Sequence, residues 1–151
     1  MLLIVTMIDW DHLVIMDIVL GVFSIINLGI VAFGLRYDWT HYIYGVAIGM
    51  IFYSIIYFVS KMIYKKEAFG SGDIFLIGAI GIVLGGKMTL VTSLLAFYVA
   101  LFGILIFRLF GKKVGRQTEI PFGPSVCIAA FVMSIYGEEI VAFLYRLMGY
   151  Q

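Results

Sequence analysis

The sequence predicts an all-α fold, a polytopic transmembrane bundle of about six helices, some of them short. Of the 151 residues, 64% are hydrophobic and only 13% are charged, and the mean hydropathy is +1.12. A soluble domain carries about 45–50% apolar and about 25% charged residues. Apolar runs also recur along the chain at lengths near the roughly 20 residues that cross a bilayer as a helix. Both observations indicate a chain that lies in a membrane.

The apolar runs predict the helices in order. The first eight residues are apolar and too few to cross alone, so they are expected to form part of a helix. Residues 18–34, 42–60 and 88–107 are predicted to span the membrane. Residues 74–86 and 125–137 are runs of 13 residues each, a length more typical of buried or re-entrant segments. No internal repeat or low-complexity linker interrupts the chain, so residues 1–151 are expected to form a single integral-membrane domain.

Composition excludes several functional classes. The formal net charge of +1 leaves no basic face for a nucleic-acid partner. Cys127 is the only cysteine, so no disulfide framework and no cysteine-based zinc site is expected. His12 and His41 fall far apart in the predicted topology, and neither a metal nor any other cofactor is expected. The apolar N-terminus has no basic residue before it and does not read as a secretory signal.

Positive charge predicts the orientation. Basic residues cluster in two connections between apolar runs: Lys61, Lys65 and Lys66, and then Lys112, Lys113 and Arg116. If the helices alternate in direction, both connections fall on one face, which the positive-inside rule makes cytoplasmic. The same alternation places three unusual stretches on that face: residues 8–17 (IDWDHLVIMD), 69–73 (FGSGD) and 120–124 (IPFGP). We therefore expect a cytoplasm-facing cleft, in the plasma membrane, at which these stretches meet.

Asp73 follows Gly70, Ser71 and Gly72 at the start of an apolar run. One interpretation is structural: the carboxylate caps a helix, and the glycines shape the turn before it. The other is functional, since Gly70 and Gly72 remove side-chain bulk and let a substrate backbone approach the carboxylate. A carboxylate inside the membrane is costly without a water-filled cavity or a partner, which favours a functional site.

A second carboxylate on the same face would make Asp73 part of a catalytic pair. Asp9, Asp11 and Asp17 are the options, and the structural alternative is a polar connection in which Asp17 caps the next helix. Asp9 directly ends an apolar stretch, so a membrane helix would deliver it near the boundary. Two neighbouring carboxylates share a proton and divide the roles of acid and base. We predict Asp9 and Asp73 as the catalytic pair, with Asp11 as the alternative partner.

Two further patterns have mainly a structural interpretation. Pro121 and Pro124 preset the backbone for a helix start, and Gly123 gives freedom between them, close to where the substrate is expected to approach. Gly81 and Gly85 have the small-xxx-small spacing of a helix-packing face.

Taken together, these stretches resemble the type IV prepilin peptidase family, membrane aspartyl proteases that include the archaeal preflagellin peptidases. The family pattern reads Ile-Asp-x-x-His, Pro-Asp, Gly-x-Gly-Asp and Ile-Pro-Phe-Gly-Pro. This chain shows Ile8-Asp9 with His12, then Asp17, residues 70–73 and residues 120–124, in the family's order. The resemblance implies that Asp9 and Asp73 are catalytic. It also implies that the substrates are prepilin-like precursors (type IV pilins, pseudopilins or archaellins), whose leader is removed at the cytoplasmic membrane face.

Three departures from the family pattern matter. Met16 replaces the proline before Asp17, and Phe75 replaces a lysine commonly found two residues after the Gly-x-Gly-Asp aspartate. The longer bacterial members also carry an N-terminal helix and a cytosolic segment with paired Cys-x-x-Cys motifs, associated with N-methylation of the product. Neither is present in the 151 residues, so we expect peptidase activity and assign no methyltransferase activity.

Two alternatives remain. A presenilin-like protease also uses Gly-x-Gly-Asp, but its partner motif would involve Asp38, which the topology puts on the opposite face, and no Pro-Ala-Leu motif follows. The other alternative is a non-catalytic membrane protein, either a transporter or a degenerate peptidase that serves as a scaffold. Cleavage of a prepilin distinguishes these classes.

Overall fold

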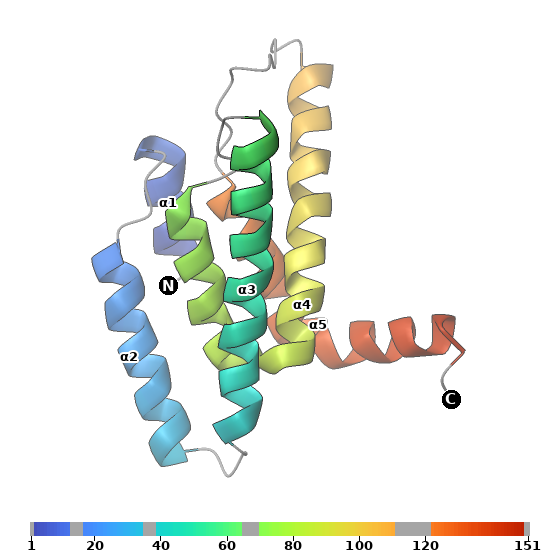
Figure 1. Cartoon of the computed structure of the whole chain (residues 1–151). Coiled ribbons are helices and arrows are strands. Elements are labelled where there is room, and N and C mark those ends of the chain that lie inside the picture. The colour runs from blue at the N-terminus through green and yellow to red at the C-terminus, as the bar shows by residue number, and fades with distance from the viewer. Residues whose placement is uncertain (1, 13–16, 35–38, 65–69, 111–121, 150–151) are drawn as a thin grey trace.

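The computed structural model describes residues 2–12, 17–34, 39–64, 70–110 and 122–149, and its regular elements within these ranges are all helices (Figure 1). They are α1 (Leu2–His12), α2 (Asp17–Gly34), α3 (Trp39–Tyr64), α4 (Ser71–Leu109) and α5 (Gly123–Leu147). The predicted all-α class is therefore confirmed. The predicted runs 18–34 and 42–60 correspond to α2 and to the middle of α3.

Helix α4 turns back on itself at Gly85. This residue has φ 73° and ψ 176°, a left-handed conformation that glycine adopts without a Cβ penalty. In Figure 1 the chain runs down one limb of α4 (71–84), reverses, and runs up a second limb (86–109). The five elements therefore comprise six helical segments in the described part of the chain. The predicted runs 74–86 and 88–107 lie largely on the two limbs.

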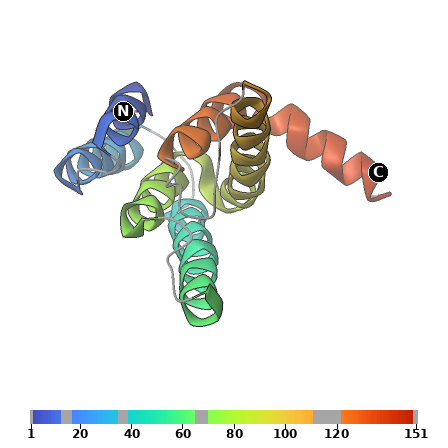
Figure 2. The same ribbon diagram turned by 90° about the horizontal axis from the view of Figure 1, so that it is seen from above.

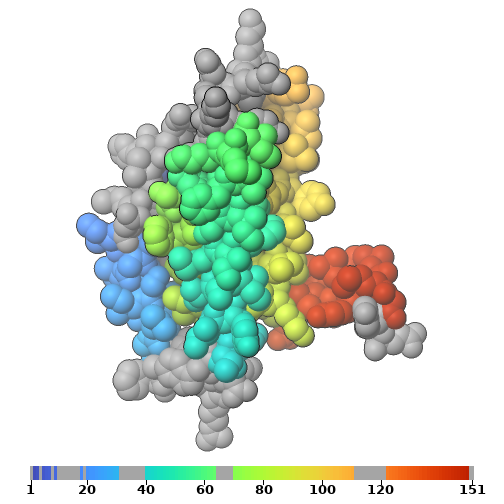
Figure 3. Space-filling model, viewed as in Figure 1, coloured from blue at the N-terminus to red at the C-terminus, as the bar shows by residue number. Residues whose placement is uncertain are grey.

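Helix α3 packs against both limbs of α4. A Cβ built on Gly49 would lie 3.0 Å from Thr89 Cγ2 and 3.3 Å from the carbonyl oxygen of Ile77. These two residues lie on opposite limbs, so α3 lies at the seam between them, and Figure 3 shows it at the front of the bundle with a limb on either side.

A glycine contact brings α3 and the first limb together. A Cβ on Gly81 would lie 2.5 Å from the carbonyl oxygen of Gly45, and one on Gly45 would overlap the Gly81 carbonyl. Small residues permit such backbone approach in membrane bundles. Gly81 therefore lies on a packing face, as predicted. Gly85 lies on it too, since a Cβ on Gly45 would be 2.8 Å from the Gly85 Cα, and this residue also forms the turn between the limbs.

Three helices are long and apolar enough to cross a membrane by length and composition: Thr40–Ile63, Ser71–Leu109, in which residues 86–109 form the longer limb, and Gly123–Leu147. A shorter apolar stretch, Leu20–Ile30, lies in α2. Large apolar side chains cover the outside of the bundle, among them Phe58 on α3 and Phe102 on α4. A bilayer would cover such residues, so the chain is a multi-pass membrane protein.

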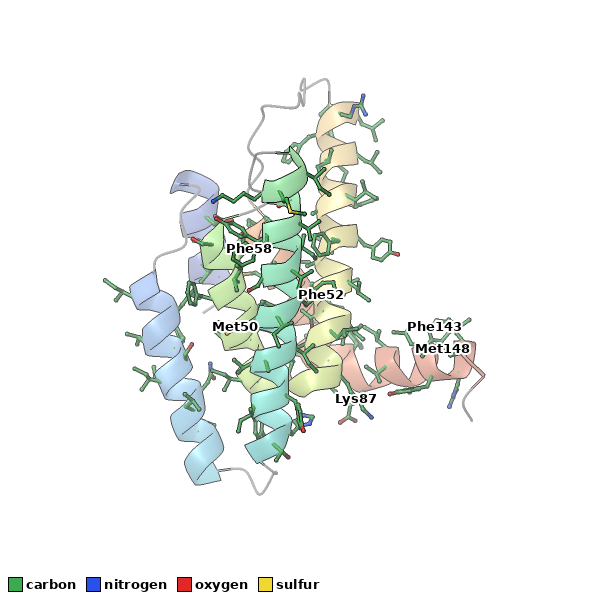
Figure 4. All side chains as sticks on the ribbon, in the orientation of Figure 1. Met50, Phe52, Phe58, Lys87, Phe143 and Met148 are labelled. Atoms are coloured by element: carbon green, nitrogen blue, oxygen red, sulfur yellow. The ribbon has the colours of Figure 1, made fainter. Side chains whose placement is uncertain are left out.

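Helix α5 is longer than the run of residues 125–137 that the sequence predicts, because it continues to Leu147. Its buried residues nevertheless end at Gly137. Figures 1 and 2 show the remainder extending away from the other helices, with the C-terminus at its tip. Figure 4 shows Phe143 and Met148 on this part and Lys87 near its base, where the Lys87 ammonium lies 5.6 Å from the Tyr145 ring centroid.

Candidate active site

Asp73 lies in the first turn of α4 and is only 4% exposed. Gly70 is the N-cap residue, and its carbonyl oxygen accepts a hydrogen bond of 3.1 Å from the Asp73 backbone N–H. In the opposite direction, the Gly70 backbone N–H donates to the Asp73 carboxylate, as the third residue of a capping box does. Asp73 is thus a capping residue, and its side chain is also buried inside the bundle.

Asp9 lies near the end of α1 and is 5% exposed. It faces the first residue of α5: the Gly123 backbone N–H donates a hydrogen bond to the Asp9 carboxylate. A Cβ on Gly123 would lie 2.5 Å from Asp9 Oδ2 and 3.0 Å from its Cγ. A side chain at position 123 would therefore occupy the space of the Asp9 carboxylate, and glycine leaves that space open. The adjacent Pro124 is buried and starts the helix, a position that tolerates its missing N–H.

The fold brings Asp9 and Asp73 together although 63 residues separate them in the sequence. The two carboxylates lie within electrostatic range of each other. Cys127, one turn into α5, interacts electrostatically with both, so α5 borders the pair. Among the described residues, neither Asp9 Oδ2 nor Asp73 Oδ1 has a hydrogen-bond partner, and both atoms are buried. Each carboxylate thus keeps one oxygen that no described protein group uses.

Side chains that the sequence analysis did not single out adjoin this pair. Tyr53 on α3 is fully buried, and its side chain lies within electrostatic range of Asp73. Its ring centroid lies 6.1 Å from that of Phe122, the residue before α5. The sequence held one signal for this position of Tyr53. Tyr53 follows Gly45 and Gly49 at intervals of four residues, which places it on the face of α3 that packs against α4.

Other predicted positions lie elsewhere. Gly70 is exposed and Gly72 half-buried, both beside Asp73. Phe75 is 54% exposed and lines an apolar groove of about 360 Å³ between α2, α3 and α4. Pro121 and Asp38 lie outside the described residues, as do the side chains of Asp11, His12 and Asp17.

No group of three or more His, Cys, Asp or Glu side chains able to hold a metal ion is found in the part of the chain that the structure describes.

Comparison with known proteins places these residues in context. The model of the type IV leader peptidase family matches residues 1–107, which include both Asp9 and Asp73. A prepilin leader peptidase/N-methyltransferase of Pseudomonas aeruginosa is 29% identical over 153 aligned residues, 99% of this chain and 51% of that protein.

Two other proteins of the same name are related to this chain at a comparable level of sequence identity. One from Stutzerimonas stutzeri is 32% identical over 142 residues, 93% of this chain and 48% of its own length. One from Bacillus subtilis is 28% identical over 116 residues, 73% of this chain and 42% of its own length. The chain therefore spans about half the length of these curated relatives or less. No solved structure matches it significantly.

Proposed function

The chain belongs to the type IV leader peptidase family, and on this premise we propose that it is a membrane aspartyl endopeptidase. Its substrates would be prepilin-like precursors, namely type IV pilins, pseudopilins or archaellins. It would remove their leader peptide at the cytoplasmic face of the plasma membrane, as a single integral-membrane domain. The observation that carries this proposal is the pairing of Asp9 and Asp73, two buried carboxylates with one unused oxygen each.

The catalytic roles follow from the chemistry of such a pair. Two buried carboxylates at close range share one proton, because both cannot ionise easily. The ionised carboxylate takes a proton from water, whose oxygen attacks the scissile carbonyl carbon. The protonated carboxylate gives its proton to the carbonyl oxygen. When the tetrahedral intermediate collapses, one of its hydroxyls returns a proton to the ionised carboxylate and the C–N bond breaks. The leaving amine takes its proton from the other, protonated carboxylate. The pair is then back in its starting state.

The residues around the pair provide room for an extended peptide. Gly70 and Gly72 precede Asp73 without side chains, so a substrate backbone can approach that carboxylate closely. On the other side, we assign Pro121, Gly123 and Pro124 to the segment that supports Asp9 and borders the approach. The protein thus supplies two acid–base groups and open backbone between them.

Cleavage of a precursor in liposomes tests this function. The purified chain is reconstituted with one prepilin-like precursor, and the product is identified by mass spectrometry. We expect the wild type to release the leader and Asp73→Asn to lose at least about 100-fold in rate, the lower end of what acid–base groups contribute. Glu138→Gln changes an exposed carboxylate on α5 and should cleave normally. A wild-type protein that leaves the leader attached would contradict the proposal and favour a transporter or a scaffold.

A further inference from the structure

The end of α5 forms a helical segment outside the bundle. It comprises residues 138–148, which follow the last buried residue of the helix, Gly137, and include the C-cap residue Met148; we call it the projecting segment. All of its side chains are exposed or half-buried, and Phe143 and Leu147 are 62% and 68% exposed. A contiguous apolar surface of this kind marks a place where something binds.

The projecting segment is amphipathic. One stripe along it carries the charged side chains and a tyrosine, namely Glu138, Glu139, Tyr145 and Arg146, with the small Ala142 between them. The other stripe carries large apolar side chains, namely Ile140, Phe143, Leu144, Leu147 and Met148. Spacings of three, four and seven residues place the members of each stripe on one face of a helix. A helix with two such faces suits the boundary between water and hydrocarbon.

Two contacts place the projecting segment level with the start of the second limb of α4. Where the segment begins, a Cβ on Gly137 would lie 3.1 Å from the Met88 sulfur. Near its other end, the Lys87 ammonium lies 5.6 Å from the Tyr145 ring centroid. Both ends therefore lie near residues 87–88. Figure 1 accordingly shows the segment running across the direction of the two limbs.

This level is a boundary of the membrane core. Lys87 is exposed, and the next charged residue on the second limb is Arg108, near its end. At a rise of about 1.5 Å per residue, the helix from Lys87 to Arg108 is about 30 Å long, which is the thickness of the hydrocarbon core. Arg108 lies in the same half of the bundle as Asp73 (Figure 1), so the projecting segment lies at the opposite boundary.

The apolar stripe faces the hydrocarbon side of this boundary. In Figure 4, Phe143 lies on the upper side of the segment, toward the end of the second limb that carries Arg108, and Lys87 lies below it. The exposed Leu90 and Leu94 of the second limb begin its lipid-facing surface at the same level. The lipid that covers this surface is thus continuous with the lipid that the apolar stripe faces.

We propose that the projecting segment is an in-plane anchor, whose partner is the lipid at the membrane interface opposite the half that holds Asp73. Its apolar stripe inserts among the acyl chains, and its polar stripe lies among the headgroups. Tyr145 and Lys87 lie at headgroup level, where aromatic and basic side chains are favoured. Only the part of α5 before Gly137 then runs through the membrane, although the whole helix is long and apolar enough to cross it.

Depth measurements with spin labels in liposomes test the proposal. Single cysteines replace Glu139, Phe143, Arg146 and Leu147, each in a Cys127→Ala background. Collisions of each label with oxygen, which dissolves in the bilayer, and with a nickel chelate, which stays in water, report its depth. The Phe143→Cys and Leu147→Cys labels should lie about 5–10 Å below the headgroup boundary, and the other two labels above it.

Matched controls come from the second limb and from the polar stripe. Leu90→Cys and Leu94→Cys are exposed positions on a helix that crosses the core, so their labels should differ in depth by about 6 Å. A charge on the apolar stripe, Phe143→Glu, should move the Leu147→Cys label toward water. Arg146→Glu places a charge on the polar stripe and should leave the depth of that label unchanged.

Three results would overturn the inference. A depth that changes steadily by about 1.5 Å per residue from position 139 to position 147 would show that the segment crosses the membrane. Contact with water at all four positions would show that it does not lie on the bilayer. Labels at positions 143 and 147 that neither reagent reaches would show that protein covers the apolar stripe, and dipolar coupling between labels would identify a second copy. If Phe143→Cys does not fold, Leu147→Cys alone decides between these outcomes. Precursor cleavage is not the readout, so the result is independent of the proposed function.

Discussion

Gly123 lacks a side chain at the place where Asp9 packs, and this contact joins two of the sequence motifs. The first N–H groups of a helix have no intrahelical partner and carry the positive end of the helix dipole. Asp9 lies at this end of α5 and accepts a hydrogen bond from Gly123, although it belongs to α1. The carboxylate thus caps a neighbouring helix, and the cap holds it beside Asp73.

Gly123→Ala should therefore displace Asp9. A Cβ at 2.5 Å from Asp9 Oδ2 is closer than real contacts permit, so the carboxylate or α5 must move. We expect precursor cleavage to fall by about 10-fold or more, since small misplacements of reacting groups are costly. Initial rates in liposomes measure this effect. Gly103→Ala is the control, because a Cβ there meets nothing within 4 Å. Equal rates for the two variants would show that the Gly123 contact does not position Asp9.

At the scale of single residues, the sequence identifies the charged residues of the site better than the uncharged residues that pack beside them. Asp9 and Asp73 could be singled out because a carboxylate next to an apolar run is costly and invites an explanation. Tyr53 could not be separated by type from the other nine tyrosines of the chain. Its burial near Asp73 arises only from the packing of α3 against both limbs of α4.

Among the elements, α4 determines how the site is built. The first limb carries Asp73, and both limbs pack against α3 because the chain reverses at Gly85. The sequence correctly separated the runs 74–86 and 88–107. The left-handed backbone at Gly85 could not be predicted, because Gly81 and Gly85 together also fit a packing face. Likewise, the continuation of α5 beyond Gly137 was missed, since Glu138 and Glu139 resemble a boundary.

Gly85→Ala tests the reversal of α4. A backbone with φ 73° and ψ 176° costs a side-chain-bearing residue about 1–3 kcal/mol, and the added Cβ would also overlap the His41 ring. We expect the unfolding temperature in detergent to fall. His41→Ala in the same chain should recover part of the loss, because it relieves the overlap and leaves the backbone strain. Gly29→Ala adds a Cβ in open space and serves as control. A Gly85→Ala variant as stable as Gly29→Ala would contradict the turn.

For the whole molecule, the central question is orientation in the membrane. Lys61 lies in the last turn of α3 and Arg108 in the last turn of α4, and both helix ends lie toward the top of Figure 1. The start of α4, with Asp73, lies in the same half of the bundle. The positive-inside rule predicts that this half faces the cytoplasm. The precursor's leader would then be cut on that side.

Cysteine labelling measures the orientation. Lys65→Cys and Lys113→Cys, each in a Cys127→Ala background, place one thiol in each basic connection. An impermeant reagent should label neither in intact cells and both in opened cells. Glu138→Cys, on the projecting part of α5, should react from outside. Labelling of either lysine position in intact cells would reverse the topology.

The most direct test of the central claim is whether Asp9 and Asp73 act as one unit. Cleavage rates are measured for Asp9→Asn, Asp73→Asn and the double variant, with Asp11→Asn as the alternative partner. Asparagine keeps the size of the side chain but cannot exchange a proton. Groups that work as a unit are not additive, so we expect all three variants of the pair to be about equally inactive, and Asp11→Asn to keep most activity. An active Asp9→Asn beside an inactive Asp11→Asn would contradict the choice of partner. Activity in both single variants of the pair would contradict the aspartyl mechanism.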